Sequence, residues 1–302
     1  MKKKKDKQSD INKEQTAPVT EFKATTLLLT CLQDMMAARE DFVSEPAGVE
    51  PVHRFRVAVR RLRSLLSFFK PVLDLQEYEA AQKQLRAMAQ DFAFVRELDV
   101  LAEDWQVATM RYPELVDYNH SKLAEMLRIE RAGAEAELYV QYGHSEAVVI
   151  LAAVRTQLTA MLRDYFADQE PLLRGFARDR MDEWIKETNK GFKKVDYTDL
   201  DAVHALRIKC KKMRYAAGAL NELLPNVYVT VEETARELQD ILGAFCDARR
   251  STDVLRSLGE RHSGEELHYE IGLYTGLQIG RASRLMGGLT KEKKRHFSIA
   301  KK

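Results

Sequence analysis

Apolar residues recur along two segments of the chain with the spacing of one face of an α helix. In the first segment they are three or four positions apart, at Val52, Phe55, Val59, Leu62, Leu66 and Phe69. This spacing predicts an amphipathic helix with one buried stripe, and Pro51 suits its first turn. The second segment repeats the stripe 151 positions later, at Val203, Leu206, Cys210, Met213, Ala217 and Leu220. The chain therefore contains an internal duplication.

The polar positions of the two segments follow the same register. In the first segment a histidine and four of the basic residues have counterparts 151 positions later: His53, Arg56, Arg60, Arg61 and Arg63 correspond to His204, Arg207, Lys211, Lys212 and Arg214. At 100° per residue, most of each set falls within about 80° on one face beside the apolar stripe. We name these rows the first basic ridge (His53, Arg56, Arg60 and Arg63) and the second basic ridge (His204, Arg207, Lys211 and Arg214). Arg61 and Lys212 lie further round each helix, and Arg54 and Lys209 point elsewhere.

Other stretches with helical periodicity surround the two segments. Residues 21–44 precede the first segment and residues 76–108 and 113–141 follow it, while residues 171–191, 229–262 and 264–287 take the corresponding places around the second. Each half thus has four predicted helices, and no stretch alternates like a strand. We expect an all-α protein in which two pseudo-symmetric four-helix units form one domain. That domain spans residues 21–290, with halves at about 21–143 and 171–290 and a linking helix at about 144–169.

Positive charge is concentrated in a few parts of the chain. The net charge is +2, but residues 1–20 carry +3 and residues 291–302 carry +5, so the body carries 2 − 3 − 5 = −6. Within the body, residues 52–70 carry +6 and residues 203–220 carry +5, both without an acidic residue, which leaves −17 elsewhere. Solvated helices normally mix charges, so acid-free runs in an acidic body predict an anionic ligand. We expect both lysine-rich tails to be disordered.

Several classes of protein do not fit the sequence. The cysteines Cys31, Cys210 and Cys246 are far apart, which indicates neither a disulfide framework nor a zinc site. The remaining histidines, His120, His144, His262, His268 and His296, show no metal-ligand spacing, and no catalytic or nucleotide-loop motif occurs. The longest apolar stretch, 147–154, is too short to span a bilayer, and polar residues follow the first lysines. We expect a cytoplasmic protein that has no cofactor and does not bind membranes.

The two ridges carry a recognisable pattern. The run His53-x-x-Arg56-Val57-x-x-Arg60-Arg61-Leu62-Arg63 and its echo from His204 to Tyr215 resemble the paired signature of the CHAD family, the conserved-histidine α-helical domains. The stretches 95–101 and 238–243, with Asp247, are similar to two further family elements. The chain departs from the family pattern at Ala93, Glu97 and Cys246. The resemblance covers residues 21–290.

This resemblance implies a function as well as a fold. CHAD-like domains bind inorganic polyphosphate on a basic surface without catalysis, which implies that His53, Arg56, Arg60, Arg61, Arg63, His204, Arg207, Lys211, Lys212 and Arg214 bind the ligand. We expect Asp99, Asp240 and Asp247, and less strongly Glu97, to face the ridges and hold arginines there before ligand binds. Many relatives also carry a triphosphate-tunnel domain, but nothing before residue 21 supplies its Glu-x-Glu-x-Lys motif. The chain resembles the stand-alone type, of which some members associate with polyphosphate granules.

Two other functions remain open at this stage. A histidine phosphotransfer protein would use an exposed histidine, but Val57 and Ile208 occupy the place where such proteins usually have a small residue. A nucleic-acid-binding module would use the same ridges, because they attract any phosphate backbone. It would lack stacking aromatics and base-reading side chains beside the basic residues, so nucleic acid is the less favoured partner.

Overall fold

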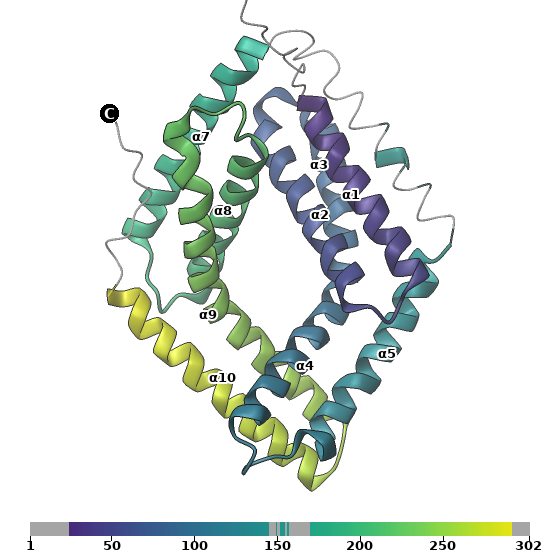
Figure 1. Cartoon of the computed structure of the whole chain (residues 1–302). Coiled ribbons are helices and arrows are strands. Elements are labelled where there is room, and N and C mark those ends of the chain that lie inside the picture. Colours follow the sequence, from purple (N-terminus) through teal and green to yellow (C-terminus); the bar gives the residue numbers. More distant parts are fainter. Residues whose placement is uncertain (1–23, 145–148, 150–151, 155, 157–169, 292–302) are drawn as a thin grey trace, which may run out of the picture.

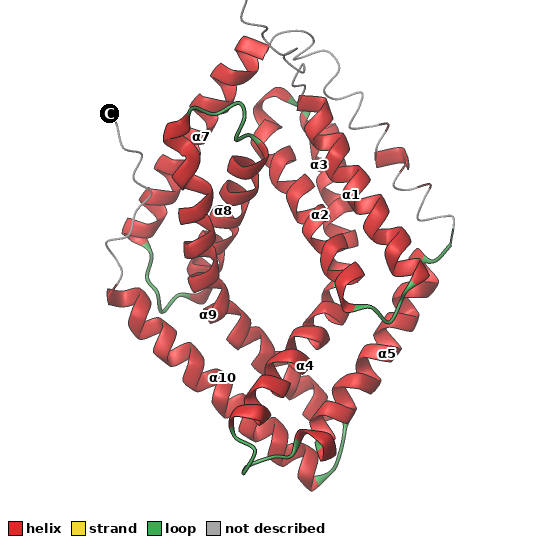
Figure 2. Ribbon diagram, in the orientation of Figure 1, coloured by secondary structure: helices red, strands yellow, loops and turns green. Residues whose placement is uncertain are grey.

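The described part of the protein is built from α helices. The computed structural model describes residues 24–144, 149, 152–154, 156 and 170–291, and no strand occurs among them (Figure 2). The all-α class predicted from the sequence is confirmed. The tail predicted at 1–20 and nearly all of the tail at 291–302 lie outside the described residues, as does most of the linking helix predicted at 144–169.

The first half contains five helices. They are α1 (Ala24–Ser44), α2 (Val49–Phe69), α3 (Leu75–Asp91), α4 (Ala93–Arg111) and α5 (Lys122–Tyr142). The single helix predicted at 76–108 is therefore wrong, because Phe92 interrupts it. The Phe92 side chain is buried and stacks on Phe55 of α2 with ring centroids 4.0 Å apart. The break thus occurs where an aromatic ring enters the core.

The start of α5 is set by a network that joins the two halves. A helix was predicted from residue 113, but α5 begins only after Ser121, whose Oγ accepts a hydrogen bond from the Ala124 N–H at 3.0 Å. Trp105 Nε1 donates to the same Oγ at 2.9 Å. The buried Glu270 carboxylate of α10 accepts from the Ser121 hydroxyl at 2.6 Å and from the Leu123 N–H at 2.7 Å. A residue near the end of the chain therefore caps a first-half helix.

The second half repeats the arrangement with one long helix in place of two. Its helices are α7 (Glu170–Lys194), α8 (Leu200–Ala219), α9 (Val229–Arg261) and α10 (Glu265–Lys291). In the 151-residue register α9 corresponds to α3 and α4 together, and Gly243 takes the position of Phe92. Since Gly243 has no side chain to bury, the helix runs through this position without a break.

The helices surround a common centre in a diamond-shaped ring (Figure 1). α2 and α8 pack against each other, and all predicted stripe residues of both helices are buried in one large hydrophobic cluster. A smaller cluster at the opposite end combines α4 and α5 with α9 and α10, and it contains Trp105, Leu127, Leu258 and Tyr274. Each cluster takes residues from both halves. The ring therefore sets the relative position of the two basic ridges.

Candidate anion-binding site

The two basic ridges come together where α2 packs against α8. The charges of Arg207 and Arg214 reach Arg60 and contribute to lowering its pKa, after the larger effect of burial. Lys211 is in turn close enough to Arg60, Arg207 and Arg56 for all three to act on it. The ridges from helices 151 residues apart thus form one cationic cluster.

Burial and crowding weaken the charged state of several cluster members. Burial lowers the pKa of Lys211 to about 7, helped by the neighbouring arginines and opposed by Asp247. Burial and Arg60 lower the pKa of Arg56 to about 10. His53 and His204 also have a lowered pKa, again mainly from burial. Without an anion, the protein holds these cations at an energetic cost.

Three arginines of the cluster have an unused donor. The Nε atoms of Arg56, Arg60 and Arg207 are buried and have no hydrogen-bond partner among the described residues. The Arg56 guanidinium is nevertheless held in place, because its Nη1 donates to the Ala89 carbonyl at 2.7 Å. A buried donor without a partner costs about 1–3 kcal/mol, and a bound anion would remove that cost.

Acidic residues balance part of the cluster. Arg207 Nη2 lies 3.2 Å from an Asp247 carboxylate oxygen, as expected for an acid that faces the ridge. Glu97 forms an ion pair with Arg250, which joins α4 to α9. Asp99 pairs instead with Arg131 at 2.9 Å, and the exposed Asp240 accepts a hydrogen bond from Gln239. The structure therefore does not place these last two acids on ridge arginines.

The flanking basic residues separate into two groups. Arg61 does not join the ridges, because it pairs with Asp34 of α1 at 3.4 Å. Lys212 is half-buried and within electrostatic range of Arg63, and this places it at the end of the first ridge. Arg63 Nε donates to Gln82 at 3.1 Å. Arg61 therefore lies apart from the ridges, and Lys212 and Arg63 lie near each other at their far end.

Arg54 and Lys209, which the periodicity places off the ridges, lie away from the cationic cluster. Arg54 pairs with Asp41 of α1 at 2.9 Å and is half exposed, and Lys209 is exposed. Arg214 remains with the cluster, and its guanidinium lies 3.3 Å from Gln239 of α9. Helical periodicity thus placed most side chains on the correct face.

Two further cations belong to the cluster and were not predicted. Arg96 of α4 acts on His53, Arg56 and Arg60, while Arg250 of α9 acts on Arg56 and His204. Neither lies in an acid-free segment, so the charge pattern did not indicate them. Arg96 stands inside the family-like stretch 95–101, and this was the one signal available from the sequence.

A cavity lies at the histidine end of each ridge. The His204 pocket, between α8 and α9, has a volume of about 290 Å³ and is lined by His204, Arg207, Asp247 and Arg250 among others. The His53 cavity, bordered by α2, α4 and α5, is larger, at about 1300 Å³. Their linings correspond in the duplication, since Glu50 and His53 match Asp201 and His204.

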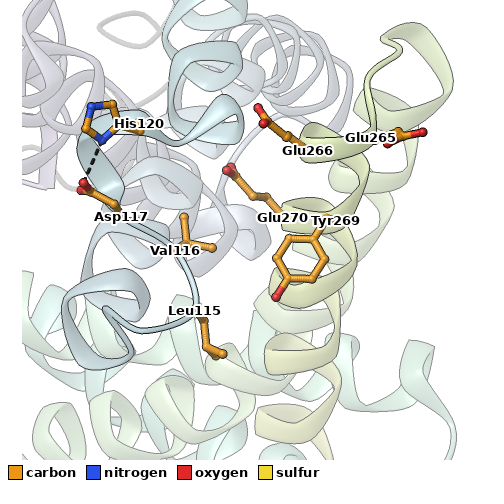
Figure 3. A pocket seen from close by; sticks show the side chains of 8 residues that line it. All are labelled: Leu115, Val116, Asp117, His120, Glu265, Glu266, Tyr269 and Glu270. Atoms are coloured by element: carbon orange, nitrogen blue, oxygen red, sulfur yellow. Dashed lines mark hydrogen bonds and ion pairs between the residues drawn. The ribbon is translucent and has the colours of Figure 1, made fainter.

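A third hollow has the opposite charge. It measures about 460 Å³ and lies between α10 and the loop before α5 (Figure 3). Glu265, Glu266 and Tyr269 line one side, and His120 interacts with Asp117 at 2.8 Å on the other. Its acidic lining does not suit an anion. Across the described part of the chain, no His, Cys, Asp and Glu side chains cluster in a way that could hold a metal ion, and no helix could span a membrane.

Gly243 provides a direct test of the cluster. A Cβ at this position would lie 3.2 Å from Arg207 Nε and 3.4 Å from Nη2. We expect Gly243→Ala to displace the Arg207 guanidinium and weaken anion binding several-fold. Stability should not fall by a similar amount, because Ala is favoured over Gly inside a helix by about 0.5–1 kcal/mol. Titration with an anionic polymer and thermal unfolding measure the two effects separately.

The matched control is Gly276→Ala in α10, where a Cβ would meet nothing within 4 Å. This variant should leave binding unchanged. If both variants bind as the unmodified chain does, the Arg207 guanidinium does not contact the ligand.

Comparison with known proteins identifies related sequences and folds. The family model of the CHAD domain matches residues 26–256. A comparison with curated proteins finds no match to this sequence.

Two solved structures share the fold. The crystal structure of the CHAD domain from the plant Ricinus communis has a TM-score of 0.68 at 21% identity, with 88% of this chain and 90% of that chain covered. PptA from Streptomyces chartreusis has a TM-score of 0.65 at 14% identity, with 90% and 98% covered. At these identities the likeness establishes the fold alone.

Proposed function

Because the chain belongs to the CHAD domain family, which is linked to polyphosphate binding in general, we propose that it binds inorganic polyphosphate along the two ridges without a catalytic step. The observation that carries the proposal is the set of buried Nε donors of Arg56, Arg60 and Arg207 that lack partners within the described chain. These donors come from α2 and α8 and lie in one cationic cluster.

The chemistry of the ligand fits this arrangement. Polyphosphate is a flexible polyanion without bases, so its receptor needs a row of cationic donors and no stacking surface. Arginine offers forked donors that match phosphate oxygens, whereas lysine offers a compact point charge. Each 18-residue segment spans about 27 Å at 1.5 Å per residue, which is long enough to contact several phosphates.

The proposed binding residues follow from the placement of the side chains. They are the histidines, the arginines and the lysines of the cluster, with Arg96 and Arg250 added to the set predicted from the sequence and Arg61 given a smaller role because it pairs with Asp34. A cytoplasmic location and association with polyphosphate granules belong to the same proposal.

Salt dependence distinguishes a track for a polyanion from a pocket for one small anion. We expect the logarithm of the affinity to fall linearly with the logarithm of salt concentration. By analogy with nucleic acids, each neutralised phosphate should contribute about 0.7–0.9 to the slope. Fluorescence titration with polyphosphates of defined length measures the slope. Its size should correspond to several neutralised phosphates. A slope near one would contradict the track.

Two comparisons complete this experiment. A chain trimmed to residues 21–290 should keep tight binding near physiological salt, since the tails would act only at long range and be screened. Loss of nearly all affinity would identify the tails as the receptor. Competition between polyphosphate and duplex DNA at fixed salt tests the alternative of a nucleic-acid-binding module. Polyphosphate should compete better, because the described part of the cluster has no row of stacking aromatics.

A further inference from the structure

The His53 cavity has a more varied lining than a site for polyphosphate requires. Cationic groups occur at its His53 end, where Arg96 joins the cluster, whereas along the remainder acidic and basic side chains mix with neutral polar and apolar ones. The latter include Ala102, Gln106, Tyr118 and Leu127. A simple polyanion would leave most of this surface unused.

One buried carboxylate of the lining has an unused oxygen. The Asp99 side chain is only 1% exposed, and its Oδ1 accepts a hydrogen bond from Arg131 Nε at 2.9 Å. Its Oδ2 is buried and has no partner among the described residues. Arg131 is fixed by Glu135 and by the Gly48 carbonyl, so it holds Asp99 in one position. An unpaired buried carboxylate oxygen calls for a donor such as a hydroxyl group.

These groups follow one another along α4. Arg96, Asp99, Glu103 and Gln106 all line the cavity, and at 1.5 Å per residue the row is about 15 Å long. The row runs from the Arg96 cation, past the carboxylates of Asp99 and Glu103, to the neutral amide of Gln106, with Ala102 one helical turn before it. This order matches a molecule with phosphates at one end, hydroxyls in the middle and a planar ring at the other.

We propose that the His53 cavity binds a nucleoside polyphosphate. Its phosphates point toward His53 and Arg96, a ribose hydroxyl donates to Asp99 Oδ2, and the base lies among Ala102, Gln106 and Tyr118. This site goes beyond the binding of inorganic polyphosphate and does not depend on it. The two ligands meet at His53, so each should reduce the affinity for the other.

The duplicated half does not offer the same site. In the His204 pocket, Asp247 stands where the first half has Arg96, and Arg250 stands where it has Asp99. The charges are therefore exchanged, and the volume is about 290 Å³ rather than about 1300 Å³. One nucleotide per chain is expected.

Isothermal titration of the full chain with ATP, adenosine and tripolyphosphate tests the proposal. ATP should bind with one site per chain and more tightly than either fragment. Ala102→Phe should fill the cavity and weaken ATP binding at least tenfold, while tripolyphosphate binding changes less than twofold. Asp99→Asn should also weaken ATP binding. Because this change could disturb Arg131, thermal unfolding accompanies it, and Ala102→Phe provides the independent variant.

Two results would overturn the proposal. One is the absence of ATP binding at millimolar concentration. The other is ATP binding that Ala102→Phe leaves unchanged and that charge reversal of Arg56 and Arg60 abolishes, because ATP would then be a short polyanion on the ridges. Long-chain polyphosphate titrated into the same samples reports the proposed function separately, so failure of one does not imply failure of the other.

Discussion

Charge reversal in either basic ridge should weaken polyphosphate binding by at least about 100-fold, since each charge-assisted hydrogen bond contributes about 1.5–3 kcal/mol and 1.4 kcal/mol is tenfold. The first variant combines Arg56→Glu with Arg60→Glu, and the second combines Arg207→Glu with Lys211→Glu. Both pairs lie in the same cationic cluster, so both should have similar effects. Titration with a polyphosphate of defined length at fixed salt measures the affinity.

The matched control reverses two charges that do not face the cluster. Arg54 pairs with Asp41, and Lys209 is exposed. Arg54→Glu with Lys209→Glu changes the net charge as much as either ridge variant, yet should change the affinity little. Circular dichroism checks that all variants fold, and Arg→Gln versions at the same ridge positions give a milder test. A large effect in only one ridge would show that the ligand does not span both.

Binding should take up a proton at Lys211 near neutral pH. In the free protein burial and the neighbouring arginines lower the pKa of this ammonium group from 10.5 to about 7. Bound phosphates favour the charged form and raise the pKa again. Between these two values the bound state holds more protons than the free state. Affinity should therefore fall by up to about tenfold per pH unit as the pH rises above 7.

The groups that face Lys211 do not obscure this signal. They are Arg56 and Arg60 of α2, Arg207 of its own helix and Asp247 of α9. Of these, Arg56 has a pKa lowered by burial only to about 10, well above the range in which Lys211 takes up its proton. Isothermal titration in buffers of different ionisation enthalpy counts the protons directly. Lys211→Arg keeps the charge at every pH tested and should flatten the dependence above pH 7.

Proton uptake that persists in Lys211→Arg would exclude Lys211 as its source. The histidines give a separate signal, because burial lowers the pKa of His53 and His204 below 6.5. Their uptake should occur between about pH 6 and 7 and disappear when both are changed to Gln. If it does not disappear, the histidines are structural residues.

The sequence predicts the two central helices well because their pattern is redundant. The apolar stripe occurs twice, 151 positions apart, and every stripe residue is buried. Positions such as Arg54 could be assigned by angle alone, since the stripe fixes which side of the helix faces the core. The position of Arg61 was less certain because this residue lies further round the helix from the other ridge residues. Its partner Asp34 comes from α1, which the periodicity of α2 cannot reveal.

The remaining features depend on contacts between distant parts of the chain. The break at Phe92 reflects packing on Phe55, and a periodic pattern carries no mark of it. Arg96 and Arg250 join the cluster only because α4 and α9 approach α2 and α8, respectively. The pairing of Asp99 with Arg131 likewise requires α5 to lie beside α4. None of these contacts follows from local spacing.

The capping of α5 by Glu270 has a consequence for the order of folding. The hydrogen bond from Ser121 to Glu270 joins residues 149 positions apart, and the surrounding core combines α4 and α5 with α9 and α10. During synthesis the first half therefore leaves the ribosome before α9 and α10 have been made. The apolar surface of α4 and α5 stays uncovered until the last helix packs against it. Closing so long a loop is slow compared with forming local helices. A single half, such as the unit that was duplicated, could complete this core only by pairing with a second copy of itself.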